Sequence, residues 1–203
     1  MLTHQEWLIT DTGKIIDCTA PIQNEWVEES YRLYRFLTDV EDILTTIADN
    51  SERLSVIRPL VRKLLNNNPW LLTEYAPADP ELGWAVTTLY DEPNFPLTVQ
   101  TVAWFPGQVS PIHNHGTWGL VALISGQEKN IIWQENPSGS TAKIQPVGEL
   151  ILNPGDIITF LPTAIHHIEA LGMEPTVSFN LYGETDYEQR FEFDPVSSIK
   201  KIF

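Results

Sequence analysis

The sequence predicts a mainly β fold, a sandwich or a small closed barrel, preceded by a pair of α-helices. Three observations carry this prediction. Apolar residues recur at spacings of three and four up to about residue 68, which is the period of an amphipathic helix. From about residue 84 onward, short runs rich in β-formers alternate with turns of Gly, Pro and Asn. The 203 residues suit one compact domain, or one domain with a helical extension.

The helical part is expected to run from residue 22 to about residue 68, with an interruption at residues 49–51. Ser51 is a residue type that caps helix N-termini, so we expect it to begin the second helix. Pro59 lies within the second helical run, and we expect a kink or a break near it because proline lacks the backbone donor. The run Asn66-Asn67-Asn68-Pro69 ends the helical part.

Nine short strands are expected in the remainder of the chain, separated by turns of Gly, Pro and Asn. Their expected ranges are Gly83–Tyr90, Leu97–Phe105, Gly119–Ser125, Lys129–Trp133, Ala142–Gln145, Glu149–Leu152, Asp156–Phe160, His166–Leu171 and Thr176–Tyr182. We therefore expect residues 1–80 to form a helical segment that packs on a β-barrel of residues 81–203, within one compact domain. The aromatic tail, residues 184–203, is expected to pack back on the barrel, whose interior can hold a site.

The composition argues against several classes of partner and location. The formal net charge is −15, which disfavours nucleic acid and anionic membranes as partners. Cys18 is the single cysteine, so an internal disulfide is excluded and a reducing cytoplasm is favoured. We see no signal peptide and no apolar run near the ~20 residues that span a bilayer. A cytoplasmic protein, monomeric or homodimeric, is expected.

Four of the five histidines fall in two short stretches, Pro111-Ile-His-Asn-His115 and Ile165-His-His-Ile-Glu169. Residues two apart on a β-strand point to the same face, so His113 and His115 can bind one metal ion together. A third histidine from another strand would complete one face of the coordination shell. Imidazole suits iron, copper, zinc or nickel. A single histidine is more often a core or surface residue, but the strand and turn patterns around these two stretches favour a metal site.

The second stretch offers two histidines, and adjacent residues of a strand face opposite ways. His166 shares its face with Ile168 and Ala170, whereas His167 shares its face with Glu169. Because the apolar face should point into the barrel, His166 is expected to be the third ligand. His167 is expected to lie behind the ligands or at the surface, where it can pair with Glu169.

These two stretches resemble the two motifs of the cupin superfamily. The first reads Gly107-x5-His113-Asn-His115, and the second contains Gly155, Pro162 and His166 in that order. The resemblance implies a cupin fold, a double-stranded β-helix or jelly-roll barrel, here with an N-terminal pair of α-helices. Germin-like cupins place a metal-binding Glu a few residues after the second histidine, where this chain has Trp118-Gly-Leu-Val121.

A site of three histidines without a carboxylate resembles the thiol dioxygenases, the family of cysteine dioxygenase and 3-mercaptopropionate dioxygenase. The run Trp104-Phe-Pro-Gly107 ahead of Ser110-Pro-Ile-His-Asn-His-Gly-Thr-Trp-Gly119 is similar to the bacterial members. His166-His-Ile-Glu169 resembles the family's His-Arg-Val-Glu. Ser178-Phe-Asn-Leu-Tyr182 resembles its Ser-x-His-x-Tyr strand, with Asn180 in place of His.

The resemblance implies iron(II) held by His113, His115 and His166, although the same ligands also bind nickel, zinc or copper. In the resembled enzymes a thiolate and O₂ meet at the iron, and both oxygen atoms end on sulfur as a sulfinate. The residues implied for catalysis form a row on one face of a strand: Ser178, Asn180 and Tyr182. The alternative for the tyrosine is a buried ring whose hydroxyl is satisfied by the barrel.

Two departures limit the assignment of a substrate. Animal-type cysteine dioxygenases hold the substrate carboxylate with an Arg on an early strand, and the corresponding stretch here is Val86-Thr-Thr-Leu89. They also carry a Cys that is crosslinked to the strand tyrosine, and that position here is Gly119, so we predict no thioether crosslink.

Two residues are therefore candidates for binding the substrate. Bacterial 3-mercaptopropionate enzymes use an Arg shortly after the strand tyrosine, and Arg190 lies in about that place, where it can grip a carboxylate with two hydrogen bonds. An ion pair of Arg190 with Glu188 or Glu192 is the alternative. Trp118 is a candidate wall of the pocket, with a core position as the simpler alternative.

The resulting expectation is an iron(II)-dependent thiol dioxygenase whose partners are O₂ and a small thiol, 3-mercaptopropionate-like or cysteine. Two other functions stay open. One is another three-histidine cupin oxygenase, for example one that cleaves a carbon–carbon bond. The other is a non-catalytic cupin that binds a metal or a small ligand.

Overall fold

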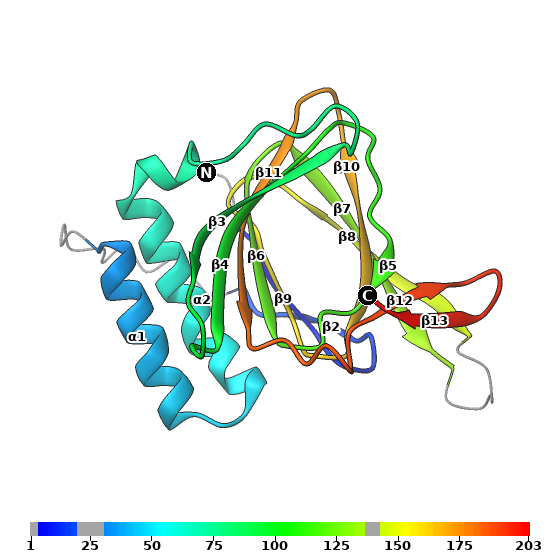
Figure 1. The fold of residues 1–203 in the computed structure, drawn as a ribbon, viewed down its shortest axis with the longest axis horizontal. Coiled ribbons are helices and arrows are strands. Elements are labelled where there is room, and N and C mark those ends of the chain that lie inside the picture. The colour runs from blue at the N-terminus through cyan, green and yellow to red at the C-terminus, as the bar shows by residue number, and fades with distance from the viewer. Residues whose placement is uncertain (1–3, 20–30, 137–142) are drawn as a thin grey trace.

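Two facing β-sheets form the body of the molecule, and two helices pack against the outside of one sheet (Figure 1). The computed structural model describes residues 4–19, 31–136 and 143–203. The mainly β architecture predicted from the sequence is therefore confirmed. Residues 22–30 of the expected first helix and residue 142 of an expected strand lie outside the described residues.

The strands form a seven-stranded and a six-stranded sheet. The first has the order β2-β1-β9-β6-β11-β4-β3, built from β1 (Glu6–Ile9), β2 (Ile15–Asp17), β3 (Trp84–Asp91), β4 (Leu97–Trp104), β6 (Gly119–Ser125), β9 (Ile157–Phe160) and β11 (Thr176–Gly183). The second has the order β13-β12-β5-β10-β7-β8, built from β5 (Ile112–His113), β7 (Gln127–Glu135), β8 (Ile144–Leu152), β10 (Ile165–Leu171), β12 (Phe191–Asp194) and β13 (Ile199–Ile202).

The expected strands all fall on observed strands, with the ranges 142–145 and 149–152 lying on the single strand β8. The chain also forms short strands outside the expected ranges. β1 pairs in parallel with β9, so part of the segment 1–80 belongs to the barrel itself, and the expected boundary at residue 80 does not separate helices from sheet. β12 and β13 extend the six-stranded sheet, which is how the aromatic tail packs back.

The helices are α1 (Leu33–Thr46) and α2 (Asn50–Asn67), followed by a 3₁₀ turn, η1 (Pro69–Leu72). The cap of α2 is Asp49, whose side chain accepts a hydrogen bond from the backbone N–H of Glu52, so the expectation of Ser51 was wrong by two residues. α2 runs through Pro59 without a break. In the described ranges, no helix combines the length and apolar character needed to cross a bilayer.

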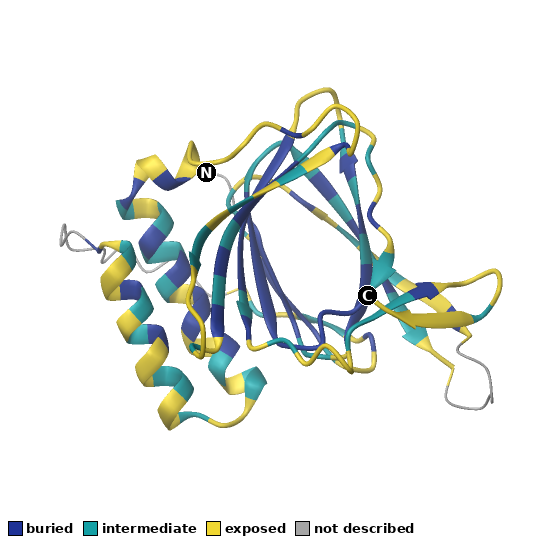
Figure 2. Ribbon diagram, viewed as in Figure 1, coloured by how far each residue is buried: buried dark blue, intermediate teal, exposed yellow. Residues whose placement is uncertain are grey.

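The seven-stranded sheet is buried on both faces, which decides where the site lies. One apolar cluster joins its outer face to the helices, and a second lies between the two sheets. On β11, Phe179 and Leu181 belong to the helix-side cluster. Because side chains alternate along a strand, Ser178, Asn180 and Tyr182 point the other way, into the barrel. Figure 2 shows the resulting pattern, with buried strands facing the interior and exposed residues on the outer faces of the helices.

A buried ion pair fastens α2 to the edge of the barrel. Glu6 on β1 is 9% exposed and accepts hydrogen bonds from the guanidinium groups of Arg58 and Arg62 on α2. Arg62 also donates to the backbone oxygen of Gly155, in the turn before β9. The helix layer is thus held by directed polar contacts as well as by apolar packing.

Candidate metal centre

Three histidines from the two motifs meet inside the barrel. His113 ends β5 and is the cross-strand partner of His166 on β10, while His115 follows two residues after β5 ends. One ring nitrogen from each of the three lies within 4.8 Å of the others. The Nε2 atoms of His115 and His166 are 2.9 Å apart, and the rings of His113 and His115 stack at a centroid distance of 5.0 Å.

This arrangement fits a transition-metal ion. Ligand nitrogens about 2.1 Å from an ion, on neighbouring corners of an octahedron, lie about 3 Å apart. The distance of 2.9 Å between the Nε2 atoms of His115 and His166 matches that value. Three neutral imidazoles on one side of an ion leave the other side open to further ligands. The cluster is therefore suited to metal binding.

Each of two histidines is oriented by a hydrogen bond to its second nitrogen. His113 Nδ1 lies 2.9 Å from the backbone oxygen of Pro111, and His166 Nδ1 lies 3.0 Å from Oδ1 of Asn130. Since both partners are acceptors, Nδ1 carries the proton and Nε2 is left free to bind a metal. Phe160 lies under the rings, 4.1 Å from the centroid of His166.

The environment keeps these imidazoles neutral. Burial lowers the pKa of His113 to about 4, against the effect of its hydrogen bond to Pro111. Burial also lowers the pKa of His115 and of His166 well below the usual value, and the neighbouring histidines act in the same direction. A metal ligand must be an unprotonated imidazole, so at neutral pH no proton has to leave before an ion binds.

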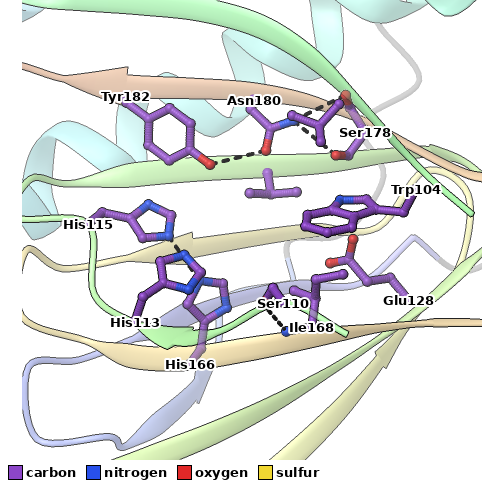
Figure 3. Close-up of a pocket in the computed structure, with 12 residues that line it drawn as sticks. Trp104, Ser110, His113, His115, Glu128, His166, Ile168, Ser178, Asn180 and Tyr182 are labelled. Carbon is purple, nitrogen blue, oxygen red and sulfur yellow. Dashed lines mark hydrogen bonds between the residues drawn. The ribbon is translucent and has the colours of Figure 1, made fainter. Parts of the chain in front are cut away.

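A cavity of about 80 Å³ opens on the histidine cluster and extends away from it between the sheets (Figure 3). The histidines and Tyr182 lie at one end, and Trp104, Glu128 and Ser178 lie at the other. A cavity of this volume has room for several water molecules or for a small ligand in their place.

The three residues expected for catalysis form one hydrogen-bonded row along this cavity. Tyr182 donates its hydroxyl proton to Oδ1 of Asn180 at 3.2 Å, and Asn180 Nδ2 donates to Oγ of Ser178 at 2.9 Å. The ring of Tyr182 lies 4.8 Å from that of His115. Burial raises the pKa of Tyr182, and the charge of Glu128 acts in the same direction, so the phenol stays protonated.

Arg190 lines a second pocket, of about 260 Å³, which shares His113, His115 and Tyr182 with the cavity. Its guanidinium lies 4.6 Å from the ring centroid of Phe203. Its Nε is buried without a hydrogen-bond partner among the described residues. Of the two glutamates considered as partners, neither forms an ion pair with Arg190 in the described ranges, and Glu192 pairs with Lys201 instead.

Asn114, which lies between His113 and His115 in the sequence, holds the chain on both sides of Arg190. Asn114 is 3% exposed, and its amide donates to the backbone oxygen of Gln189 and accepts from the backbone N–H of Phe191. Gly116 has a φ of +63°, and a Cβ there would lie 2.5 Å from the backbone oxygen of Asp186. The segment of residues 186–191 can therefore pack closely against the first histidine motif. This packing brings Arg190 next to the histidine cluster.

Two expected positions need correction. Trp118 does not line the cavity or the second pocket. It is 4% exposed and packs in the apolar cluster between the helices and the seven-stranded sheet. His167 does not pair with Glu169, which binds Lys129. His167 instead accepts a hydrogen bond at 2.8 Å from the indole N–H of Trp133, on the face of β10 that points away from the centre.

Gly119 lies opposite Tyr182 across β6 and β11. A Cβ at this glycine would be 2.9 Å from two ring carbons of Tyr182. The missing side chain therefore lets the tyrosine ring approach the strand, where the animal-type pattern would have a crosslinked cysteine.

Three residues of the site were not predicted: Trp104 and Glu128, which line the cavity, and Asn130, which lies behind it and contacts Glu128 and His166. On β7, Glu128 and Asn130 are 2% and 0% exposed, because they share the inward face with Ile132. Asn130 Nδ2 donates to Oε1 of Glu128 at 2.8 Å while its Oδ1 meets His166, so a continuous chain runs from a carboxylate to a metal-binding histidine. The available signal was the spacing of two that puts Glu128 and Asn130 on the same face of the strand as the apolar Ile132.

Replacing Asn130 by alanine should lower the affinity for metal by about ten- to hundredfold, the usual effect of losing the partner of a ligating histidine. Asn130→Asp keeps an oxygen that accepts from Nδ1 of His166 and should retain most of the affinity. Competition with a chromophoric zinc chelator measures both. Equal losses in the two variants would show that the amide supports the site by packing rather than by orienting the ring.

No family model matches the chain. Similar solved structures include an oxalate oxidase in complex with the substrate analogue glycolate, 16% identical over 56% of this chain and 57% of that chain, with a TM-score of 0.44. The Cnp3 cupin domain of Schizosaccharomyces pombe is 10% identical over 52% of this chain and 67% of that chain, with a TM-score of 0.40. A cupin superfamily protein of Desulfitobacterium hafniense DCB-2 is 12% identical over 50% of this chain and 77% of that chain, with a TM-score of 0.39. The chain thus spans little more than half the length of the oxalate oxidase. Likenesses of this degree carry no information on substrate or reaction.

Proposed function

We propose that the protein is an iron(II)-dependent thiol dioxygenase that oxidises a small thiol to its sulfinate in the cytoplasm. The observation that carries the proposal is the convergence of three neutral imidazoles on a small cavity, with no carboxylate in the cluster among the described residues. Three neutral ligands leave the positive charge of the ion uncompensated, which favours an anionic thiolate as a further ligand. The sequence resemblance to thiol dioxygenases points to the same chemistry.

The reaction balances as thiolate plus O₂ giving sulfinate, in which sulfur loses four electrons and the two oxygen atoms gain them. Iron, when bound, supplies the site at which thiol and O₂ meet and exchange electrons. The chain supplies geometry and a dry environment. His113, His115 and His166 would hold the ion, and Phe160 excludes water from one side of the cluster.

Tyr182 is the proposed positioning group for the bound reactants. Its proton is directed to Asn180, so its hydroxyl oxygen remains able to accept a hydrogen bond from a ligand in the cavity. Asn180 does not titrate near neutrality, so the row formed with Ser178 fixes the tyrosine in place and does not relay protons. This fixed geometry is what would align a thiol and O₂ beside the ion.

Arg190 is the proposed partner of a substrate carboxylate, as in 3-mercaptopropionate or cysteine. It lines a pocket that also contains two of the histidines, and its buried Nε lacks a partner among the described residues. A guanidinium can hold a carboxylate with two parallel hydrogen bonds. A carboxylate-bearing thiol held in this way would have its sulfur at the histidine cluster.

The test is O₂ uptake by protein reconstituted anaerobically with iron(II), with metal-stripped protein as the control. The panel is 3-mercaptopropionate, cysteine, cysteamine, mercaptosuccinate and a diketone without a thiol. We expect uptake with at least one thiol and an equal amount of sulfinate. Uptake with the diketone alone, or with no compound, would exclude thiol oxidation.

Tyr182→Phe should lower kcat by about a hundredfold, the usual order for one preorganised polar group.

A further inference from the structure

The cavity has one acidic group and an aromatic face at the end remote from the histidines. Glu128 is 2% exposed and lines this end together with Trp104 and Ser178. Figure 3 shows the Glu128 carboxylate at the same end of the cavity as the Trp104 indole, remote from the three histidines. Among the described residues, its hydrogen-bond partner is Asn130, which donates to Oε1, so Oε2 has no hydrogen bond of its own to the chain there.

Glu128 gives the far end of the cavity a negative charge that no cationic lining residue of the described chain offsets. The lining contains no lysine or arginine, and Arg190 lies in the second pocket. An isolated buried carboxylate is unfavourable, and burial raises the pKa of Glu128 to about 7 against the opposing hydrogen bond from Asn130. A cation beside it would favour the ionised form, and the face of an indole also attracts a cation.

We infer that Glu128 and Trp104 form a subsite for an ammonium group, so that the ligand of this centre is a small aminothiol. This inference rests on the proposed thiol function for the position of the sulfur, and it narrows the substrate class. The sulfur would lie at the histidines and the amino group would reach the far end of the same cavity. The volume of about 80 Å³ suits a small ligand. Of the two substrates considered above, cysteine has the required amino group and 3-mercaptopropionate does not.

The subsite is tested by binding to the zinc-loaded protein, since zinc is redox-inert and no turnover is needed. Two ligand pairs differ only by an amino group: cysteine with 3-mercaptopropionate, and cysteamine with ethanethiol. Calorimetry should show that the amino member of each pair binds at least about tenfold more tightly, as a hydrogen bond to a charged group allows. Equal binding within both pairs would overturn the inference, and this outcome can be measured with the wild-type protein alone.

The variant Glu128→Gln separates the subsite from direct coordination of the amine to zinc. It keeps the shape of the side chain and removes its charge, so the amino advantage should fall to about twofold or less. An advantage that persists in this variant arises at the metal and overturns the inference. Glu135→Gln, at the exposed end of the same strand, is the matched control and should bind like wild type. If Glu128→Gln does not fold, Trp104→Leu should weaken the amino members selectively.

The two proposals fail in distinguishable ways. A Glu128-dependent amino preference in the zinc protein, without sulfinate from any thiol in the iron protein, would leave the subsite in place and remove the dioxygenase. Sulfinate formed from 3-mercaptopropionate, without any amino preference in binding, would have the opposite meaning.

Discussion

Replacing His166 by alanine is expected to abolish stoichiometric metal binding, whereas replacing His167, the next residue, leaves it intact. His166 Nε2 lies 2.9 Å from Nε2 of His115, while His167 bonds to Trp133 on the opposite face of the strand. Losing a supporting partner of a ligand already costs about ten- to hundredfold in metal affinity, so losing a ligand should cost at least about a hundredfold. Metal content after dialysis, measured by mass spectrometry, tests this directly.

The two variants are matched controls because each removes one imidazole from the same strand. An ion that binds only the folded protein stabilises it by about 4 kcal/mol at a thousandfold excess over Kd. Metal at that excess should therefore raise the Tm of wild type and of His167→Ala, and should stabilise His166→Ala by no more than about 1.4 kcal/mol. A metal-dependent rise in His166→Ala but not in His167→Ala would refute the choice of ligand.

The histidine cluster could be anticipated because its geometry is local. The period of a strand separates His166 from His167 by face, and the burial of Ile168 and Ala170 bears out the inward direction of that face. His113 and His115 were expected to lie on one strand, and the structure differs on this point. Only His113 lies on a strand, and the bend after it still leaves the two rings parallel to within 4°.

The helix pair and the longer strands were also predictable, because their apolar periods are sustained over several turns or pleats. Five short strands were not predicted: β1, β2, β5, β12 and β13. β1 has four consecutive buried residues, Glu6–Ile9, and pairs with a strand about 150 residues later in the chain, so neither its period nor its neighbours reveal it. β13 pairs with β12, and β12 pairs with β5, which lies far earlier in the chain, so a local pattern does not encode that pairing.

The far end of the cavity was hidden for a chemical reason. Charged residues in strands usually face water, so the face that Glu128 shares with Ile132 was not predicted to be the buried one. Its burial depends on the register of β7 against β10, where it is the partner of Ala170. The prediction for Trp118 was wrong in the opposite direction, because this residue was expected in the pocket and lies in the apolar core. Its closeness in sequence to His115 suggested the pocket, but three residues and a glycine turn bring it to the other side of the sheet.

Replacing Glu6 by alanine should be strongly destabilising although the residue lies outside the metal centre. Its carboxylate is the shared partner of Arg58 and Arg62, whose guanidinium groups lie under α2 with side chains 9% and 19% exposed. Removing one member of a buried ion pair leaves uncompensated charge and costs about 3–5 kcal/mol. In a chain of this size that corresponds to a fall in Tm of roughly 6–20 °C, measurable by calorimetry or circular dichroism.

The contrast with an exposed pair decides whether burial is the cause. Glu135 pairs with Lys200 at 3.5 Å, and both side chains are more than a third exposed, so Glu135→Ala should cost no more than about 1 kcal/mol. If the Glu6 effect comes from stranded charge, adding Arg58→Met to Glu6→Ala should recover part of the lost stability, because the double variant has one fewer unpaired cation. Additive losses would instead attribute the effect to the lost contact between α2 and β1.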